Sequence, residues 1–208
     1  MNIAAFFRNL SMMIVLAMLA SPALAAPSAN SLTSEEKAAG WKLLFDGESL
    51  KEWRLYNQKA APESGWKVED GLLKKLPRQR GGDIVTEGKF DNFDLTWEWR
   101  VAPGGNNGLK YLVTEERPSA PGHEYQLIDD IGHPDGRLGA KRQTASFYDV
   151  LPPAADKPLK PVGEWNSSRV LIQGNHVETL ARVWPTSRIS CFHASRPGTR
   201  PDRSTWAG

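Results

Sequence analysis

The amino-acid sequence predicts an all-β protein, a β-sandwich or jelly roll, and two observations lead to this prediction. Residues 93–101 alternate apolar and polar side chains without interruption, which is typical of a strand with one buried face. Other short segments have a strand-like composition and are separated by Gly, Pro and Asn, which favour turns. Because helical periodicity is absent after residue 39, many short strands joined by turns fit a sandwich best.

The first 25 residues have the features of a secretory signal peptide. Arg8 precedes an apolar run over residues 12–20, and the small residues Ala23 and Ala25 mark a cleavage site. This run is shorter than the roughly 20 residues that a membrane-spanning helix needs. We therefore expect an exported protein, secreted or periplasmic, whose mature form has no membrane span.

Residues 26–39 are predicted to form a linker and a short helix, and strands follow. Thr33 is a suitable helix N-cap, because acidic residues occupy the first turn after it. Strands are expected at 41–45, 66–69, 71–73, 83–86, 93–101, 109–113, 124–128, 146–150 and 168–173. The polar positions of three of them are expected to line one side of a sheet, with Glu98, Arg100, Lys110, Glu124 and Gln126. An antiparallel sheet with one face in water explains the same pattern.

Charge and cysteine content restrict the classes of function. Cys191 is the single cysteine, so the chain forms no internal disulfide. The net charge is +2, but residues 179–208 hold five arginines against one acidic residue, so the part before them is mildly acidic. Nothing in that part indicates a nucleic-acid partner.

Seven short motifs occur in an order that resembles one family. They lie at residues 40–53, 66–73, 82–86, 90–100, 106–111, 124–130 and 163–166, and include LFDGESLKEW, WKVEDGLL and EYQLIDD. Together they resemble the exported 3-keto-disaccharide hydrolases, also described as 3-keto-glucoside 1,2-lyase/3-keto-2-hydroxyglucal hydratase domains. The resemblance implies a concanavalin-like jelly roll over residues 40–178 with a concave sugar-binding face.

The resemblance also implies a reaction. Its substrate would be a glycoside whose carbon 3 is already a ketone, which acidifies the hydrogen on carbon 2. A base removes that hydrogen, the group on carbon 1 leaves, and water adds to the unsaturated sugar, which gives net hydrolysis. A sugar 3-dehydrogenase acting upstream is implied as the supplier of substrate. The alternative is a non-catalytic carbohydrate-binding module, because the same fold hosts both functions.

The catalytic candidates come from the matched motifs. Glu124 and Asp129 are candidates for the base or for a metal ligand, and Lys110 and Arg100 for stabilising the enolate by charge. Carboxylates at a solvent-exposed strand end, and cross-strand ion pairs with Glu98 or Glu124, explain these residues equally well.

Binding candidates lie in the same segments. The candidates for substrate binding are Asn106, Asn107, Gln126, Glu98, Arg142 and Tyr148. The two asparagines stand beside glycines, so turn formation is the alternative for them. The resemblance is compatible with a divalent metal ion of unknown identity and implies no organic cofactor. Its candidate ligands are Asp129, Asp130, His133 and His123, although loop histidines are often exposed without a role.

The C-terminal segment departs from the family pattern. Glu178 is followed by Thr-Leu-Ala-Arg where the family has His-Trp-Leu, and a one-base shift of the reading frame restores that motif. We therefore expect residues 179–208 to be an unrelated, disordered tail, with the closing strands of the sandwich missing. The alternative is a native basic tail that binds an anionic surface.

Overall fold

A computed structural model describes residues 30–182 and 191–194, and most of their regular structure is β-strand. The expected signal peptide at 1–25 and the linker before residue 30 lie outside the described residues. The short helix is α1 (Ser34–Ala38), which begins at a capping box between Thr33 and Glu36. Within the described residues, no helix is long and apolar enough to cross a membrane.

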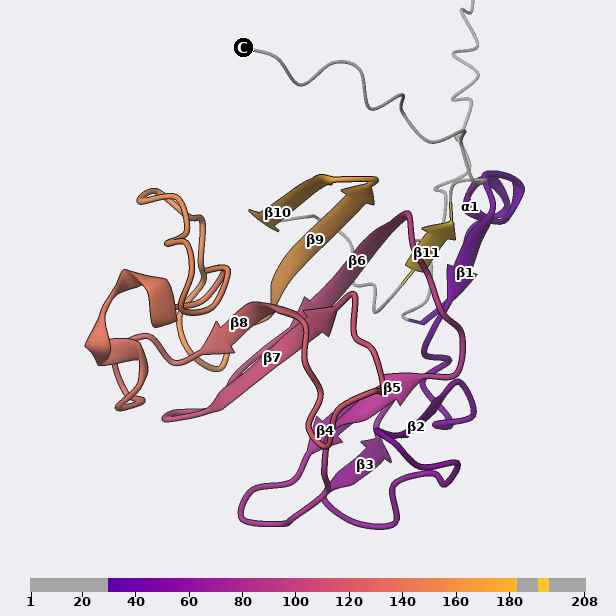
Figure 1. The fold of residues 1–208 in the computed structure, drawn as a ribbon, viewed down its shortest axis with the longest axis horizontal. Coiled ribbons are helices and arrows are strands. Elements are labelled where there is room, and N and C mark those ends of the chain that lie inside the picture. Colours follow the sequence, from indigo (N-terminus) through magenta and orange to yellow (C-terminus); the bar gives the residue numbers. More distant parts are fainter. Residues whose placement is uncertain (1–29, 183–190, 195–208) are drawn as a thin grey trace, which may run out of the picture.

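The largest sheet has five strands in the order β1, β11, β6, β9, β10. These are β1 (Trp41–Leu43), β11 (Cys191–Ala194), β6 (Phe93–Trp99), β9 (Asn166–Gln173) and β10 (His176–Arg182). All neighbours are antiparallel. Figure 1 shows this sheet across the upper part of the molecule, with β9 and β10 joined by a tight turn.

Three two-stranded ribbons make up the other strands of residues 30–182. They are β2 (Trp53–Leu55) with β5 (Ile84–Thr86), β3 (Trp66–Glu69) with β4 (Leu72–Lys75), and β7 (Asn106–Tyr111) with β8 (His123–Ile128). The first two ribbons lie in the lower part of the molecule in Figure 1. After β8 come two short 3-10 helices, η1 (Gly136–Leu138) and η2 (Ala140–Arg142), in the long loop segment on the left.

The core lies between the five-stranded sheet and the β7–β8 ribbon. The side chains of β6 alternate between buried and half-buried positions, as the sequence predicts. The rings of Trp97 and Tyr125 meet edge to face with their centres 5.1 Å apart. Ser168 on β9 joins the same contact, because its hydroxyl lies 2.8 Å from the hydroxyl of Tyr125 and accepts a hydrogen bond from the indole of Trp99 at 2.8 Å.

Two sequence predictions about strands need correction. Residues 146–150 form no strand but two isolated bridges around Phe147, because Ala145 and Asp149 have positive φ and bend the chain at both ends. The second correction concerns Asn106 and Asn107, which the sequence places in a turn. They are the first residues of β7 and pair with Ile128 and Leu127. Their backbone is therefore part of the ribbon and not of the preceding turn.

The expectation that residues 179–208 form no strands is wrong at two places. Gly174, with φ of 60°, makes the turn of a hairpin whose pairing continues from His176 through Arg182. Residues 191–194 form β11, which pairs with both β1 and β6. These backbone bonds fill edges that would otherwise lack partners. The rest of the predicted tail, 183–190 and 195–208, lies outside the described residues.

Candidate active site

The polar face of the β7–β8 ribbon carries the candidate site. Tyr125 on β8 faces the core, so its neighbour Glu124 faces the opposite side. Lys110 stands opposite Glu124 in the register of β7 and β8. On the other side of β8, the backbone N–H of Tyr148 donates to the carbonyl of Glu124 at 3.0 Å. We call Lys110, Glu124 and Tyr148 the Glu124 row.

Glu124 lies half-buried over the backbone of β7. A Cβ atom added to Gly108 would stand only 1.9 Å from Oε1 of Glu124, so the carboxylate occupies the space that a side chain at Gly108 would need. Within the described part of the chain, this carboxylate makes no hydrogen bond or ion pair. Burial raises its pKa above the ordinary value, the charge of Lys110 opposes that rise, and the charges of Asp83 and Asp135 add to it.

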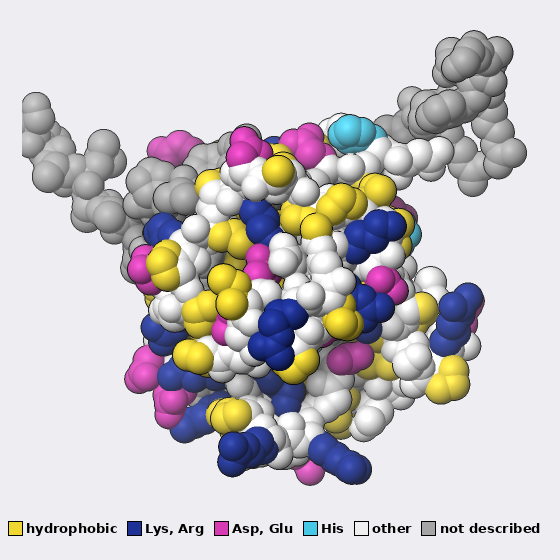
Figure 2. Space-filling view, turned by 90° about the vertical axis from the view of Figure 1, so that its left-hand side faces the viewer, with side chains coloured by type: hydrophobic (Ala, Val, Ile, Leu, Met, Phe, Trp, Pro, Cys, Tyr) yellow, Lys and Arg dark blue, Asp and Glu magenta, His cyan; other side chains and the backbone are white. Residues whose placement is uncertain are grey.

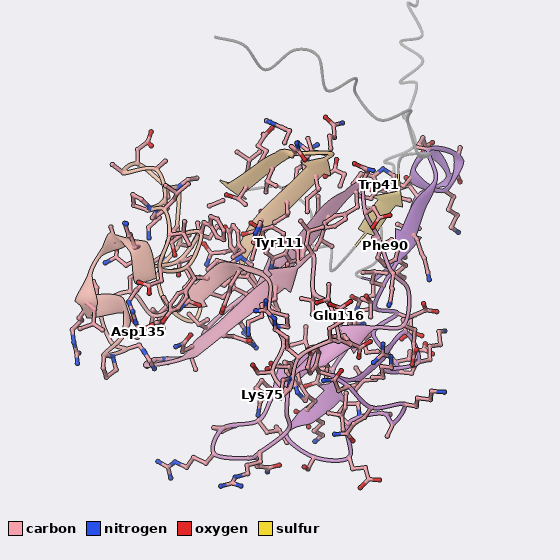
Figure 3. The ribbon with its side chains drawn as sticks, viewed as in Figure 1. Trp41, Lys75, Phe90, Tyr111, Glu116 and Asp135 are labelled. Atoms are coloured by element: carbon pink, nitrogen blue, oxygen red, sulfur yellow. The ribbon has the colours of Figure 1, made fainter. Side chains whose placement is uncertain are left out.

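Tyr148 is held by a charged network. Its hydroxyl donates to Oδ2 of Asp135 at 2.9 Å and accepts from Nη1 of Arg142 at 3.0 Å. The same Arg142 nitrogen contacts Oδ1 of Asp135 at 2.7 Å, and the guanidinium also forms two bonds with Asp149. The bond from Arg142 is the main cause that lowers the pKa of Asp135, while burial and then Asp135 raise the pKa of Tyr148. Asp135 lies in the loop just before η1 (Figure 3).

The remaining polar residues of this face differ in exposure. Lys110 is exposed, and its ammonium group donates to the carbonyl of Ala120 at 3.2 Å. Gln126 is buried, with 1% of its surface exposed, so it is not directly available to a ligand. Asn106 and Asn107 are exposed at the start of β7, where the side chain of Asn107 accepts from the N–H of Gly108.

Asp129 and Asp130 hold the loop segment in place. The carboxylate of Asp129 accepts from the backbone N–H groups of Gly104 at 2.8 Å, Gly132 at 2.7 Å and Ile131 at 3.2 Å. These bonds, chiefly those from Gly104 and Gly132, lower its pKa, so it is a poor base. Asp130 accepts from the N–H of Thr144 at 2.7 Å and pairs with Lys157 at 2.6 Å. The structure therefore assigns loop-fixing contacts to both residues.

The four predicted metal ligands do not form a ligand set. The oxygens of Asp129 and Asp130 already accept bonds, and Nδ1 of His133 accepts from the N–H of Asp135 at 3.1 Å. His123 contacts the rings of Tyr111 and Phe147, on the face of β8 opposite Glu124. Within the described residues, no group of three or more His, Cys, Asp and Glu side chains is arranged to hold a metal ion.

Glu98 and Arg100 do not share a face with Glu124, contrary to the sequence prediction. Because Trp97 and Trp99 point into the core toward Tyr125, the side chains that alternate with them point away from it. Arg100 lies over the ring of Trp165, 4.9 Å from its centre. The prediction treated all polar strand faces as one, whereas two sheets packed face to face turn their polar sides in opposite directions.

Two hollows lie outside the Glu124 row. One of about 600 Å³ is lined by charged and amide side chains, including Arg54, Glu87 and Glu115. Arg54 is already bound there by Glu115, with both nitrogen–oxygen distances below 2.8 Å. The other, of about 200 Å³, lies beside Trp99 and Ile128. Figure 2 faces the end with the long loop segment, where hydrophobic and basic side chains are interspersed with acidic ones.

Sequence reasoning missed three residues that act on Glu124. Gly108 was interpreted as a turn residue, and Asp135 and Asp83 were not considered. No local sequence pattern identifies Asp135 and Asp83, since the long loop and the segment before β5 bring them toward Glu124. Gly108 lies just before the predicted strand at 109–113, so the predicted elements gave no signal for its close approach to Glu124.

Comparisons with known proteins agree with this architecture. A 3-keto-disaccharide hydrolase of Bacteroides thetaiotaomicron is 37% identical over 175 residues, which cover 73% of this chain and 59% of that protein. The chain thus spans less than two thirds of this relative. Two crystal structures from Parabacteroides distasonis, described as glycosyl hydrolases, are also similar. One has a TM-score of 0.64 at 35% identity and 74% coverage of both chains. The other has a TM-score of 0.52 at 26% identity, with 68% of this chain and 67% of that chain covered.

The family comparison covers the strands that build the site. A profile of the 3-keto-alpha-glucoside-1,2-lyase-like domain matches residues 40–183, from just before β1 to just after β10. The match includes the five residues after Glu178, where the sequence pattern first departs from the family motif. The crystal structures share the all-β architecture of this jelly roll. The chain therefore belongs to the 3-keto-alpha-glucoside-1,2-lyase-like family.

Proposed function

We propose that the protein is an exported enzyme that cleaves 3-keto-glycosides by elimination and hydration, with Glu124 as the base. The observation that carries the proposal is the carboxylate of Glu124, which lies over Gly108, half-buried and without a hydrogen bond to any residue that the structure describes. Burial raises its pKa, and a carboxylate in such an environment is a stronger base than one in water. Family membership supports the choice of a 3-keto sugar as substrate.

The first step uses the acidity that the ketone gives to carbon 2. Glu124 removes the hydrogen from carbon 2, and the negative charge moves onto the oxygen at carbon 3 as an enolate. Lys110, opposite Glu124, supplies a positive charge on the same face and stabilises that enolate. The substituent on carbon 1 then leaves, and a carbon–carbon double bond forms between carbons 1 and 2.

Hydration completes the cycle. Water adds its oxygen to carbon 1, and the protonated Glu124 returns a proton to carbon 2. The net result is hydrolysis without the pair of carboxylates that ordinary glycosidases use on the two sides of the bond. Asp129 takes no part, because its oxygens are bound by three backbone N–H groups. The substrate requires a supplier, and an enzyme that oxidises the hydroxyl on carbon 3 of a glycoside is the class that provides it.

The test measures release of the aglycone from an aryl 3-keto-glucoside. We expect turnover by the wild-type protein, and a primary isotope effect when carbon 2 carries deuterium. Glu124→Gln keeps the shape but removes the base, so turnover should fall by about 100-fold to 10,000-fold. Glu116→Gln is the matched control, because Glu116 is exposed in the loop between β7 and β8 (Figure 3) and should leave turnover unchanged.

Two results contradict the proposal. Saturable binding of the sugar without turnover would indicate a carbohydrate-binding module on the same fold. Turnover of Glu124→Gln within about threefold of the wild type would place the base elsewhere. Export is tested separately: the protein recovered outside the cytoplasm should lack residues 1–25 by mass, and a full-length mass there would exclude a cleaved signal peptide.

A further inference from the structure

Elimination needs a second proton transfer, to the oxygen that leaves carbon 1, and Tyr148 is placed to perform it. Phe147 forms an antiparallel bridge with the core-facing Tyr125, so the next residue, Tyr148, projects to the side of Glu124. The N–H of Tyr148 bonds the carbonyl of Glu124, so the two residues lie on adjacent paired segments. Such segments lie about 4.8 Å apart, which suits two groups acting on neighbouring carbons of one sugar ring.

Other side chains near Glu124 are less suitable as acids. The hydroxyl of Ser146 is buried, with 1% of the residue exposed. Asp129 has a lowered pKa and is ionised at neutral pH. Asp135 is ionised as well, because the bond from Arg142 lowers its pKa. Lys110 carries protons, but it stands on the far side of Glu124 from Tyr148 and serves the enolate. Tyr148 is left as the group with a hydrogen-bonded O–H at this place.

We propose that Tyr148 donates its phenolic proton to the leaving oxygen on carbon 1, while Glu124 takes the proton from carbon 2. This assignment rests on the proposed function. The bond between carbon 1 and the leaving oxygen breaks, its electron pair stays on that oxygen, and the oxygen takes the proton of Tyr148. In the hydration step, water gives a proton to the Tyr148 phenolate and its hydroxide to carbon 1. Both enzyme groups end in their starting states.

The neighbours of Tyr148 prepare it for this role. Arg142 donates to the phenol oxygen at 3.0 Å, and its guanidinium lies 5.3 Å from the centre of the ring. This positive charge stabilises the phenolate that forms when the proton leaves. Asp135 accepts from the hydroxyl at 2.9 Å and holds the phenol in place before substrate binds, although burial and then Asp135 raise the pKa of Tyr148, an effect that the charge of Arg142 opposes. Arg142 and Asp135 are therefore positioning residues, since they act through Tyr148.

The experiment compares leaving groups, because an acid matters most where the leaving group is poor. Tyr148→Phe keeps the ring and removes the hydroxyl, so the fold should persist with an unchanged melting temperature. We expect turnover of a methyl 3-keto-glucoside to fall by about 100-fold or more. Turnover of a nitrophenyl 3-keto-glucoside, whose leaving group needs no acid, should fall by less than about threefold. Lys110→Met should reduce turnover of both substrates by the same factor.

The outcomes separate this assignment from the proposed function. Equal losses with both substrates in Tyr148→Phe would overturn the acid role and leave Tyr148 as a binding residue. A loss confined to the methyl glycoside in Lys110→Met, and absent in Tyr148→Phe, would transfer the role to Lys110. If the wild-type protein turns over neither substrate, the proposed function fails and the assignment of Tyr148 falls with it.

Discussion

Replacing Gly108 by Ala should lower activity without lowering stability. Gly108 lies in β7 with a φ that is not positive, so alanine can adopt its backbone conformation. The added Cβ, however, would stand 1.9 Å from Oε1, 2.6 Å from Cδ and 2.8 Å from Cγ of Glu124. Contacts below 3.0 Å are essentially absent from real proteins, so the carboxylate has to move.

The size of the effect follows from that displacement. Relieving the contact with Oε1 requires the carboxylate to move by about 1 Å, and a misplacement of this size costs about 100-fold in rate. A 100-fold loss corresponds to about 2.7 kcal/mol of transition-state stabilisation. The free energy of unfolding should stay constant or rise by about 0.5 kcal/mol, because alanine restricts the unfolded chain more than glycine does.

Two measurements on one preparation check this prediction. Turnover of an aryl 3-keto-glucoside reports the position of the base, and urea unfolding reports stability. Gly88→Ala is the control, because the three nearest atoms to its new Cβ belong to the Phe90 ring and none belongs to Glu124. Activity of Gly108→Ala within about threefold of the wild type, with the protein folded, would refute the reasoning, since the base would then tolerate displacement.

Three further predictions use other contacts. Lys110→Met removes the charge that lowers the pKa of Glu124, so the acidic limb of the pH profile of kcat/KM should move to higher pH; an unmoved limb would mean that another group titrates there. Lys157→Met leaves Asp130 without its ion pair and should reduce the free energy of unfolding, measured by urea denaturation, by about 2 kcal/mol. Lys160→Met is the control, because Lys160 is exposed and its replacement should change the free energy of unfolding little. Asp129 has a pKa below its ordinary 3.8, so its contribution to stability is present above pH 3.8 and is lost as the pH falls below that value. Asp129→Asn should therefore make the melting temperature less dependent on pH in this acidic range. The same dependence of melting temperature on pH in the variant and the wild type would contradict this.

The sequence predicts the strands best where one buried face leaves a regular pattern. Residues 93–99 alternate because every second side chain packs between the sheets, and the predicted strand at 66–69 coincides with β3. Residues 146–150 also have a strand-like composition, but positive φ at both ends confines their pairing to isolated bridges. The strand content of 179–182 was missed because the family motif changes there, while backbone pairing with β9 does not depend on that motif.

The candidate site was predictable only in part. Lys110, Glu124 and Tyr148 were identified from matched motifs, and the register of β8 brings them together. Arg100 was assigned to the face of Glu124, because alternation shows which side chains of a strand share a face but not the sheet to which that strand belongs. Asp135 approaches through a loop whose path depends on the contacts of Asp129 and Asp130, which no local pattern encodes.

The hydroxyl of Ser168 is completely buried between the sheets and links the candidate active site to the core. It bonds to the hydroxyl of Tyr125, and Tyr125 is joined by one peptide bond to Glu124 on the outer face. A shift of the ring therefore tilts β8 and moves the carboxylate with it, because a strand transmits displacement from one face to the other. Conservative changes that remove only this hydroxyl contact, such as Tyr125→Phe and Ser168→Ala, should accordingly lower turnover while the protein remains folded.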